Sequence, residues 1–339
     1  MTEGPYDALL VVSFGGPEGQ DEVIPFLENV LRGRNGPPER IEQVAAHYRR
    51  FGGVSPINGQ NRALIAAIRE ELSASGVDLP VYWGNRNWHP LLADTVARMA
   101  DDGVRRALAF VTSAYASWSG CGQYLDDLAR ARAEVGADGP AIDKLRLFYN
   151  HPGFVGPNAD ALRRALNQAG GSAHVAFSAH SIPLAMAATS NYVHQLNQTA
   201  RLVAEEAIGG QGLPWQLVYQ SRSGRPDQPW LEPDIGDHLR ALDQSGVDVV
   251  VVAPIGFTSD HMEVVYDLDV EARARADQLG LRLIRAATVG TDPAFVTMIR
   301  QLVQERLDPS VPKLALGSDG PWPDQCPPGC CPPPVPATR

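Results

Sequence analysis

Long apolar runs are absent from this 339-residue chain. No segment approaches the roughly 20 consecutive apolar residues that a membrane-spanning helix needs. The first ten residues, MTEGPYDALL, also lack the basic segment and the following apolar stretch of a secretory signal peptide. We therefore expect neither a membrane span nor an export signal, and we predict a cytoplasmic protein without stable membrane association.

Lysine is almost absent, because Lys144 and Lys313 are the only lysines among 29 basic residues. The net charge of −10 argues against nucleic acid as a partner, since neutralising phosphates requires clustered basic side chains. Nearly all the positive charge is arginine, which suits paired hydrogen bonds to carboxylates. A genome rich in G and C would produce the same bias, so both explanations stay open.

Cysteine is also scarce, and its positions are uneven. The chain has Cys121 and, within six residues near the carboxyl terminus, Cys326, Cys330 and Cys331. Four cysteines make a poor disulfide framework for a large cytoplasmic protein. Four is the right number for one metal or iron–sulfur site.

Apolar, β-rich runs alternate with amphipathic helical patterns along the chain, which has 44% apolar residues. Such alternation predicts parallel, doubly wound α/β sheets. We expect strands at 8–14, 80–84, 107–113, 146–149, 174–178, 216–220, 247–254 and 282–285. We expect helices at 20–31, 38–50, 61–75, 91–101, 122–135, 159–168, 191–207, 235–243, 263–279 and 293–306.

The expected strands divide into two groups of four whose first members resemble each other. LLVVSFGGP and HVAFSAHSIP are both apolar runs that end in small and polar residues. We infer two Rossmann-like halves, residues 1–145 and 146–312, that meet at a cleft. Residues 313–339 are rich in proline and glycine, which is typical of a tail rather than a packed element.

His180 and Glu263 each follow an apolar strand, in FSAHSIP and in PIGFTSDHMEVVYDLDVEA. Ligands of open α/β sheets bind at the carboxyl ends of strands. A neutral imidazole facing a carboxylate there can take protons from a ligand and pass it a metal ion. A helix cap or a hydrogen bond in the core would explain His180 equally well. His261, two residues before Glu263, is expected to orient the loop or that glutamate.

Glu263, Asp267 and Glu271 are spaced four residues apart, so a helix would place them in one acidic stripe. A solvated acidic face is the usual explanation of such a stripe. Like charges at this spacing cost stability, however, and this stripe starts where a strand opens toward the expected cleft. Three carboxylates in a row can pass a cation along the helix.

Other loops carry weaker signals. GGVSPINGQN is typical of a turn before a helix, or of a loop that lets Ser55 reach a ligand, and GNRNWHP puts Arg86 at the end of a strand. YQSRSGRPDQPWLEPD is too rich in proline and glycine for a helix, which favours an Ω-loop held by Trp230. SFGGP lacks the glycine spacing and the lysine of nucleotide-binding loops, so we exclude a nucleotide site there.

Five of these motifs, taken together, resemble one family. LLVVSFGGP, GGVSPI, SAHSIP, YQSRSGRPDQPWLEPD and PIGFTSDHMEVVYDLD stand in the order and spacing of ferrochelatases, and the resemblance runs from Leu9 to about Leu307. Ferrochelatases insert Fe²⁺ into a porphyrin bound between two Rossmann-like halves with parallel sheets. The resemblance therefore implies a porphyrin cleft, with porphyrin and Fe²⁺ as substrates.

The resemblance also implies roles for individual residues. His180 and Glu263 match the essential catalytic pair, and with Asp267 and Glu271 they match the residues that carry the iron. Residues expected to contact the porphyrin are Ser55, Tyr124, Arg86, Phe14 and Arg32. Phe14 stands where several relatives have an iron-ligating tyrosine. Leu31 and His47 replace arginines that bind propionates in relatives, so the propionate contacts are expected to shift, for example to Arg32.

Within the family, the chain resembles the Gram-positive form that acts on coproporphyrin III and gives coprohaem. Some members of that form hold a 2Fe–2S cluster with one internal cysteine and three in a carboxyl-terminal extension. Cys121, Cys326, Cys330 and Cys331 reproduce that pattern, with tetrahedral zinc as the alternative occupant. A downstream enzyme of haem synthesis is a possible partner.

The segment between the first strand and the GGVSPI loop suits a soluble tetra-acid. Its arginines, which would attract four propionates and disfavour a lipid core, are Arg32, Arg34, Arg40, Arg49 and Arg50. Pairing with Glu28, Glu39 and Glu42 on solvated helix faces is the competing explanation. Other readings of the chain are a protoporphyrin IX ferrochelatase, a cobalt chelatase and a non-catalytic haem or iron–sulfur carrier.

Overall fold

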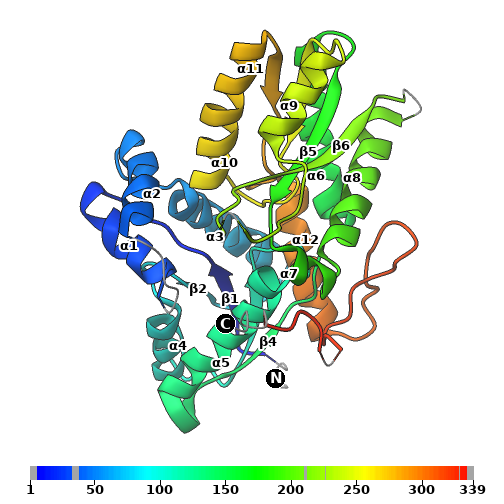
Figure 1. Cartoon of the computed structure of the whole chain (residues 1–339). Coiled ribbons are helices and arrows are strands. Elements are labelled where there is room, and N and C mark those ends of the chain that lie inside the picture. The colour runs from blue at the N-terminus through cyan, green and yellow to red at the C-terminus, as the bar shows by residue number, and fades with distance from the viewer. Residues whose placement is uncertain (1–5, 33–37, 210–211, 226, 328, 334–339) are drawn as a thin grey trace.

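The computed structural model describes residues 6–333 except 33–37, 210–211, 226 and 328. Within these residues, strands and helices alternate and form two four-stranded parallel sheets (Figure 1). The strand order is β2-β1-β3-β4 in the first sheet and β6-β5-β7-β8 in the second, so the second repeats the connectivity of the first. The predicted α/β class with two Rossmann-like sheets is confirmed.

Inner strands are built from continuous apolar runs. β1 lies between β2 and β3, and all six of its residues are buried, as expected for a strand covered on both faces. The first sheet consists of β1 (Ala8–Ser13), β2 (Val81–Asn85), β3 (Arg106–Val111) and β4 (Ala141–Lys144). The second consists of β5 (His174–His180), β6 (Trp215–Gln220), β7 (Val249–Ala253) and β8 (Arg282–Arg285).

The predicted strand at 146–149 is wrong, because β4 is the less apolar segment just before it. Residues 146–149 are buried, but they form core packing and polar contacts outside the sheet. A short buried apolar run looks the same in sequence whether it is a strand or a packed connection. The true strand lies at the edge of the sheet and is only partly buried, so its pattern is weak.

Most of the predicted helices are present, with shifted ends. α6 begins at Pro152, seven residues before the predicted start, since His151 caps it by accepting a hydrogen bond from the Gly153 N–H at 3.0 Å. The short α7 was not predicted. The helices are α1 (Val23–Val30), α2 (Pro38–Arg50), α3 (Ile57–Ala74), α4 (Leu92–Asp101), α5 (Gln123–Val135), α6 (Pro152–Ala169), α7 (Leu184–Ala188), α8 (Tyr192–Ile208), α9 (Ile235–Gln244), α10 (Met262–Tyr266), α11 (Arg273–Leu279) and α12 (Pro293–Leu307).

One hydrophobic core joins the two sheets. Phe110 of β3 packs on Phe148 with ring centroids 5.4 Å apart, and Phe148 packs on Phe295 of α12 at 5.9 Å. Each ring is at most 2% exposed, and burying one contributes about 1.5–3 kcal/mol. Helix α12 comes last but also contacts α3 beside the first sheet, so it ties the carboxyl-terminal half to the amino-terminal half (Figure 1).

The carboxyl-terminal segment packs against the body, so the prediction of an unpacked tail is wrong for its described part. Asp319 accepts hydrogen bonds from Tyr149 Oη at 3.0 Å and from His194 Nε2 at 2.8 Å. Asn150 pairs with Leu316 through its backbone carbonyl at 2.8 Å and its side-chain amide at 3.2 Å. These polar contacts hold an irregular segment in place. Because the segment has few apolar residues, its sequence pattern does not predict that it packs against the body.

Candidate active site at the carboxyl ends of the strands

The predicted catalytic residues lie where strands of the second sheet end. His180 is the last residue of β5, and Glu263 is the second residue of α10, which follows β7 and a short loop. Because β5, β6 and β7 are parallel neighbours, their carboxyl ends share one edge of the sheet. The topology therefore brings together two residues that are 83 positions apart.

His180 and Glu263 face each other directly. His180 Nε2 lies 3.5 Å from Glu263 Oε1, and the two side chains are 30% and 47% exposed, so the pair is accessible to a ligand. His180 Nδ1 contacts the Ser181 carbonyl oxygen, which can only accept a hydrogen bond. In the neutral ring Nδ1 therefore carries the proton, and Nε2 is left free to accept one.

The local charges favour a basic imidazole beside an ionised carboxylate. Burial lowers the pKa of His180, but the Glu263 carboxylate and the Ser181 carbonyl outweigh burial, so this pKa is raised above its ordinary value. Burial raises the pKa of Glu263, but His180 outweighs it and lowers this pKa to about 2. The pair can take a proton on His180 and balance the resulting charge with Glu263.

His261 supports Glu263 through the backbone. It is the N-cap of α10, and its Nδ1 accepts a hydrogen bond from the Glu263 N–H at 3.1 Å. Burial lowers the pKa of His261, which keeps the ring neutral and able to accept that bond. This contact matches the orienting role that the sequence suggested.

The acidic stripe continues from α10 into a π-helical segment, Asp267–Ala272. Asp267 accepts a hydrogen bond from the Ser221 hydroxyl, and burial raises the pKa of this carboxyl to about 7, with Glu263 and Glu271 adding to the rise. Glu271 is exposed. Glu263 and Asp267 thus differ in ionisation, because Glu263 is charged whereas Asp267 is about half protonated near neutral pH.

The residues expected to contact a porphyrin come from several elements of the first half, and Phe14 and Arg86 follow the neighbouring strands β1 and β2. Phe14 follows β1, is 38% exposed and packs edge-on against Phe26. Ser55 is 3% exposed, and its hydroxyl lies against Gly16, where an added Cβ would come within 2.9 Å of Oγ. Arg32, just after α1, is exposed.

Arg86 and Tyr124 form a buried group with Asp127. The Arg86 guanidinium lies 4.4 Å from the centroid of the Tyr124 ring and pairs with the Asp127 carboxylate. The Arg86 side chain is 7% exposed and Tyr124 is 6% exposed. Arg86 is therefore already neutralised by a neighbour, which leaves it little capacity for a ligand carboxylate.

Helix α2 brings other residues close to the acidic stripe. The His47 ring stacks on the Tyr266 ring with centroids 3.7 Å apart, which links α2 of the first half to α10 of the second. Arg49 pairs with Glu42 at 2.5 Å, as the competing explanation for that arginine requires. Arg50 is exposed, and its positive charge lies close enough to the Tyr266 hydroxyl to oppose the rise in the pKa of that group. Of the other arginines, Arg34 and the side chain of Arg40 lie outside the described residues.

The four cysteines meet on one side of the core although Cys121 is over 200 residues from the others. All four are free thiols. Cys121 interacts with Cys326 and Cys331, Cys326 interacts with Cys330, and the sulfurs of Cys330 and Cys331 are 3.5 Å apart. In the described part of the chain, no group of three or more His, Cys, Asp or Glu side chains is arranged to hold a metal ion.

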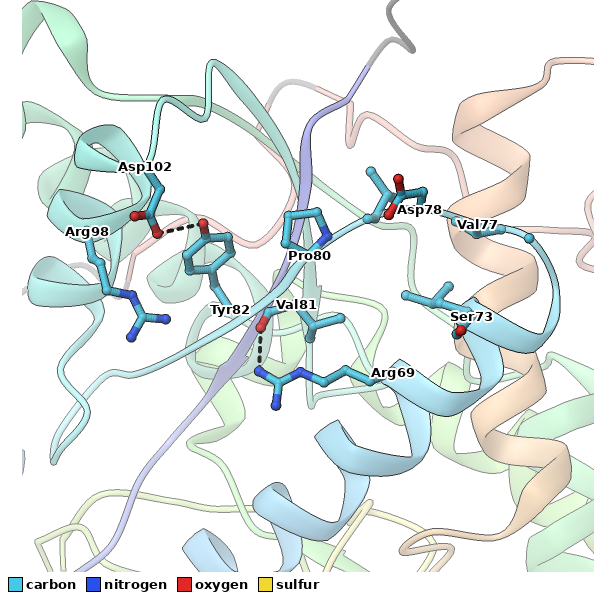
Figure 2. Close-up of a pocket in the computed structure, with 12 residues that line it drawn as sticks. Arg69, Ser73, Val77, Asp78, Pro80, Val81, Tyr82, Arg98 and Asp102 are labelled. Carbon is cyan, nitrogen blue, oxygen red and sulfur yellow. Dashed lines mark hydrogen bonds between the residues drawn. The ribbon is translucent and has the colours of Figure 1, made fainter.

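A separate pocket of about 670 Å³ opens elsewhere (Figure 2). Its lining includes Arg69, whose guanidinium donates to the Val81 carbonyl, and Tyr82, whose hydroxyl donates to Asp102. These residues surround the amino end of β2, whereas His180 lies at the carboxyl end of a strand. The side chains of Arg69, Tyr82 and Asp102 thus already form hydrogen bonds within this pocket, and neither His180 nor Glu263 is among the described residues that line it.

Two polar residues next to the pair were not singled out from the sequence. Gln220, the last residue of β6, donates a hydrogen bond from Nε2 to the Glu263 carbonyl at 2.8 Å. Tyr192 Oη donates to the His180 carbonyl at 2.9 Å. The position of Gln220 at a strand end was a usable signal, but the glycine and proline that follow it favoured a purely structural loop.

Comparisons with known proteins agree with this arrangement. A model of the ferrochelatase family matches residues 6–307. The coproporphyrin III ferrochelatase of Streptomyces coelicolor is 54% identical, over 98% of this chain and 95% of that protein. The ferrochelatase of Rhodopirellula baltica is 53% identical, over 96% of this chain and 93% of that protein.

A solved structure supports the fold. SirB from Bacillus subtilis with Fe³⁺ superposes with a TM-score of 0.51 and 10% sequence identity, over 89% of this chain and 97% of that one. At that identity the likeness concerns the fold alone. No helix in the described part of the chain is long and apolar enough to cross a membrane. The family model matches most of the chain, and relatives more than 50% identical cover nearly all of it, so the chain belongs to the ferrochelatase family.

Proposed function

We propose that this protein is a lyase that inserts Fe²⁺ into coproporphyrin III and releases coprohaem. The observation that carries the proposal is the 54% identity, over nearly the whole chain, to a relative named for that activity. The His180–Glu263 pair at the strand ends supports it, because the reaction needs a base at an accessible site. The porphyrin would lie between the two halves, residues 1–145 and 146–312.

His180 is the proposed base. A free porphyrin must lose two pyrrole protons before iron can enter its plane. Nε2 of the neutral His180 imidazole is free to accept these protons one at a time. The Glu263 carboxylate, 3.5 Å away, stabilises the protonated ring and passes the proton on. Base assistance of this kind contributes about 10²–10⁴ in rate.

Asp267 and Glu271 are proposed to hand Fe²⁺ toward His180 and Glu263. Carboxylate oxygen and imidazole nitrogen are ordinary ligands of divalent iron. Burial raises the pKa of Asp267 to about 7, so this carboxyl carries a proton part of the time near neutral pH, and a bound cation would displace that proton. Porphyrin contacts are proposed for Ser55, Tyr124, Phe14, Arg32 and Arg86, with the buried Arg86 acting through Tyr124.

The substrate assignment predicts a preference between two porphyrins. Coproporphyrin III has four propionates and protoporphyrin IX has two, so exposed arginines such as Arg32 and Arg50 favour the first. We expect kcat/KM for anaerobic Fe²⁺ insertion to be at least tenfold higher with coproporphyrin III, followed by the change in porphyrin absorption. Equal values, or a preference for protoporphyrin IX, would overturn the assignment.

We also propose that Cys121, Cys326, Cys330 and Cys331 hold a 2Fe–2S cluster. Four free thiols that already contact one another supply the donor set that such a cluster needs. A bound cluster supplies one-electron redox chemistry. The hydrogen bonds of Asp319 with Tyr149 and of Leu316 with Asn150 hold the same segment, so they would keep three of the ligands near Cys121.

The cluster proposal is tested by colour and metal content. Protein purified without air should be brown, and Cys330→Ser should remove its visible absorption because one of four ligands is lost. Ser318→Ala, a change of an exposed residue in the same segment, should leave the spectrum unchanged. Colourless protein that contains one zinc ion per chain would reject the cluster in favour of a zinc site.

A further inference from the structure

Gln220 stands out among the buried polar residues because it touches both segments that carry the proposed catalytic pair. It ends β6 and is 1% exposed. In the register of the sheet it lies directly beside His180 of β5. Nothing in the proposed proton transfer uses its side chain.

Gln220 reaches the histidine through its backbone. Its carbonyl oxygen accepts a hydrogen bond from the Ser181 N–H at 2.8 Å. The Ser181 carbonyl in turn contacts His180 Nδ1, so the same short segment sets the plane of the imidazole. A shift of Gln220 would therefore be transmitted to the ring through one residue.

Gln220 reaches the glutamate through its side chain. Nε2 donates to the Glu263 carbonyl oxygen at 2.8 Å, which fixes the first turn of α10 against the end of β6. The other side-chain atom, Oε1, is buried without a hydrogen-bond partner among the described residues. Leaving that acceptor unpaired costs stability, so what the amide contributes here is the Nε2 bond to the Glu263 carbonyl.

The next residue extends the same attachment. Ser221 has a φ of 62°, in the left-handed region that residues other than glycine seldom adopt, and its hydroxyl donates to Asp267. Such a conformation is strained for a residue with a Cβ and persists where the surroundings require it. The end of β6 thus holds two residues of the acidic stripe, one turn apart.

We propose that Gln220 is a positioning residue that keeps His180 and Glu263 at their working separation. The inference rests on the proposed function, because the separation matters only if the pair moves protons. The 3.5 Å gap between Nε2 and Oε1 leaves little room for drift before the carboxylate no longer stabilises the protonated ring. Misplacement of a reacting group by about 1 Å can cost about 100-fold in rate.

Two variants of nearly equal size test the proposal. Gln220→Met keeps the length of the side chain but removes the N–H donor, and Gln220→Glu replaces the donor by a carboxylate that repels the Glu263 carbonyl. We expect kcat for iron insertion to fall about 10–100-fold in the Met variant and further in the Glu variant. KM for the porphyrin should change less than threefold, because Gln220 is buried and does not reach a ligand.

Gln195→Met is the matched control. Gln195 is also a fully buried glutamine with one hydrogen bond to a backbone atom, from the Ala116 N–H at 2.7 Å, and with an unpartnered amide atom. It should lose similar stability while keeping kcat within threefold of wild type. Equal losses of kcat in Gln195→Met and Gln220→Met would show a general effect of destabilisation and would overturn the proposal.

Crystal structures give a second result that does not depend on activity. The distance from His180 Nε2 to Glu263 Oε1 should exceed its wild-type value by at least 0.5 Å in Gln220→Met or, if that variant does not fold, in Gln220→Glu. An unchanged distance in a folded variant would reject the positioning role. If the wild-type protein inserts iron into no porphyrin, the proposed function fails. The distance between His180 Nε2 and Glu263 Oε1 in the variants then still shows whether Gln220 positions the pair.

Discussion

His180→Ala is expected to lower the rate of Fe²⁺ insertion by about 10²–10⁴ while porphyrin binding stays within a fewfold of wild type. The base is lost, but the strand ends that surround it keep their shape. Insertion is followed anaerobically by porphyrin absorption, and binding by quenching of protein fluorescence. A variant that kept more than about a tenth of the wild-type rate would rule out His180 as the base.

Glu263→Gln should also impair insertion severely, since it removes the charge at nearly constant shape. It should change the pH profile in a defined direction. The Glu263 carboxylate helps to raise the pKa of His180 above 6.5, so the wild-type rate should fall as the pH drops through a value above 6.5 and the ring becomes protonated. In Glu263→Gln that midpoint should move to lower pH.

His194→Ala is the control for both variants. His194 is an exposed histidine whose only described role is its 2.8 Å contact with Asp319. Its removal should leave the rate and the pH midpoint unchanged. A loss of activity comparable to that of His180→Ala would show that the assay reports stability rather than chemistry.

Arg146→Met should destabilise the fold by about 3–5 kcal/mol, because it leaves the Glu305 carboxylate buried and unpaired. Both side chains are 1% exposed, and Arg146 donates to Glu305 through two nitrogens at 2.7 and 2.9 Å. Arg146 also donates to the Leu314 carbonyl at 2.9 Å, so the start of the carboxyl-terminal segment should loosen. Urea unfolding and limited proteolysis measure the two effects.

Arg163→Met is the matched change at the surface. Arg163 and Asp160 form an ion pair whose side chains are 44% and 52% exposed, and such pairs contribute about 0–1 kcal/mol. The two substitutions are chemically identical and each also removes a hydrogen bond to a backbone carbonyl, so the difference between them mainly reflects burial of the ion pair. A loss below about 1 kcal/mol in Arg146→Met would contradict the view that the substitution leaves the Glu305 carboxylate buried and unpaired.

The sheets could be predicted because each inner strand is a continuous apolar run. Continuous apolar runs such as VVVVA of β7 and ALLVVS of β1 are typical of inner strands that are buried on both faces of a parallel sheet. β4 could not be predicted, since an edge strand is half exposed and the more apolar segment after it is used in the core. Helix α6 begins early because packing and the His151 cap override its glycines and prolines.

The site divides in a similar way. His180 and Glu263 could be predicted because each follows an apolar strand in a motif of recognisable residues. Their supports could not, because the Gln220 contact depends on which strands are neighbours, and strand order is not written in any local pattern. For the same reason the sequence could not show that Asp127, 41 positions from Arg86, pairs with it.

The sequence by itself determined the α/β class, the two repeated halves, the catalytic candidates and the four cysteines, because periodicity, strand-end motifs and residue counts are local properties. Only the tertiary structure decided which of those residues meet: the 3.5 Å histidine–glutamate pair, the ring of thiols, and the docking of a proline-rich segment that looked like a free tail. Each of these depends on contacts between segments far apart in the chain, and their geometry exists only once both sheets have packed on their shared core.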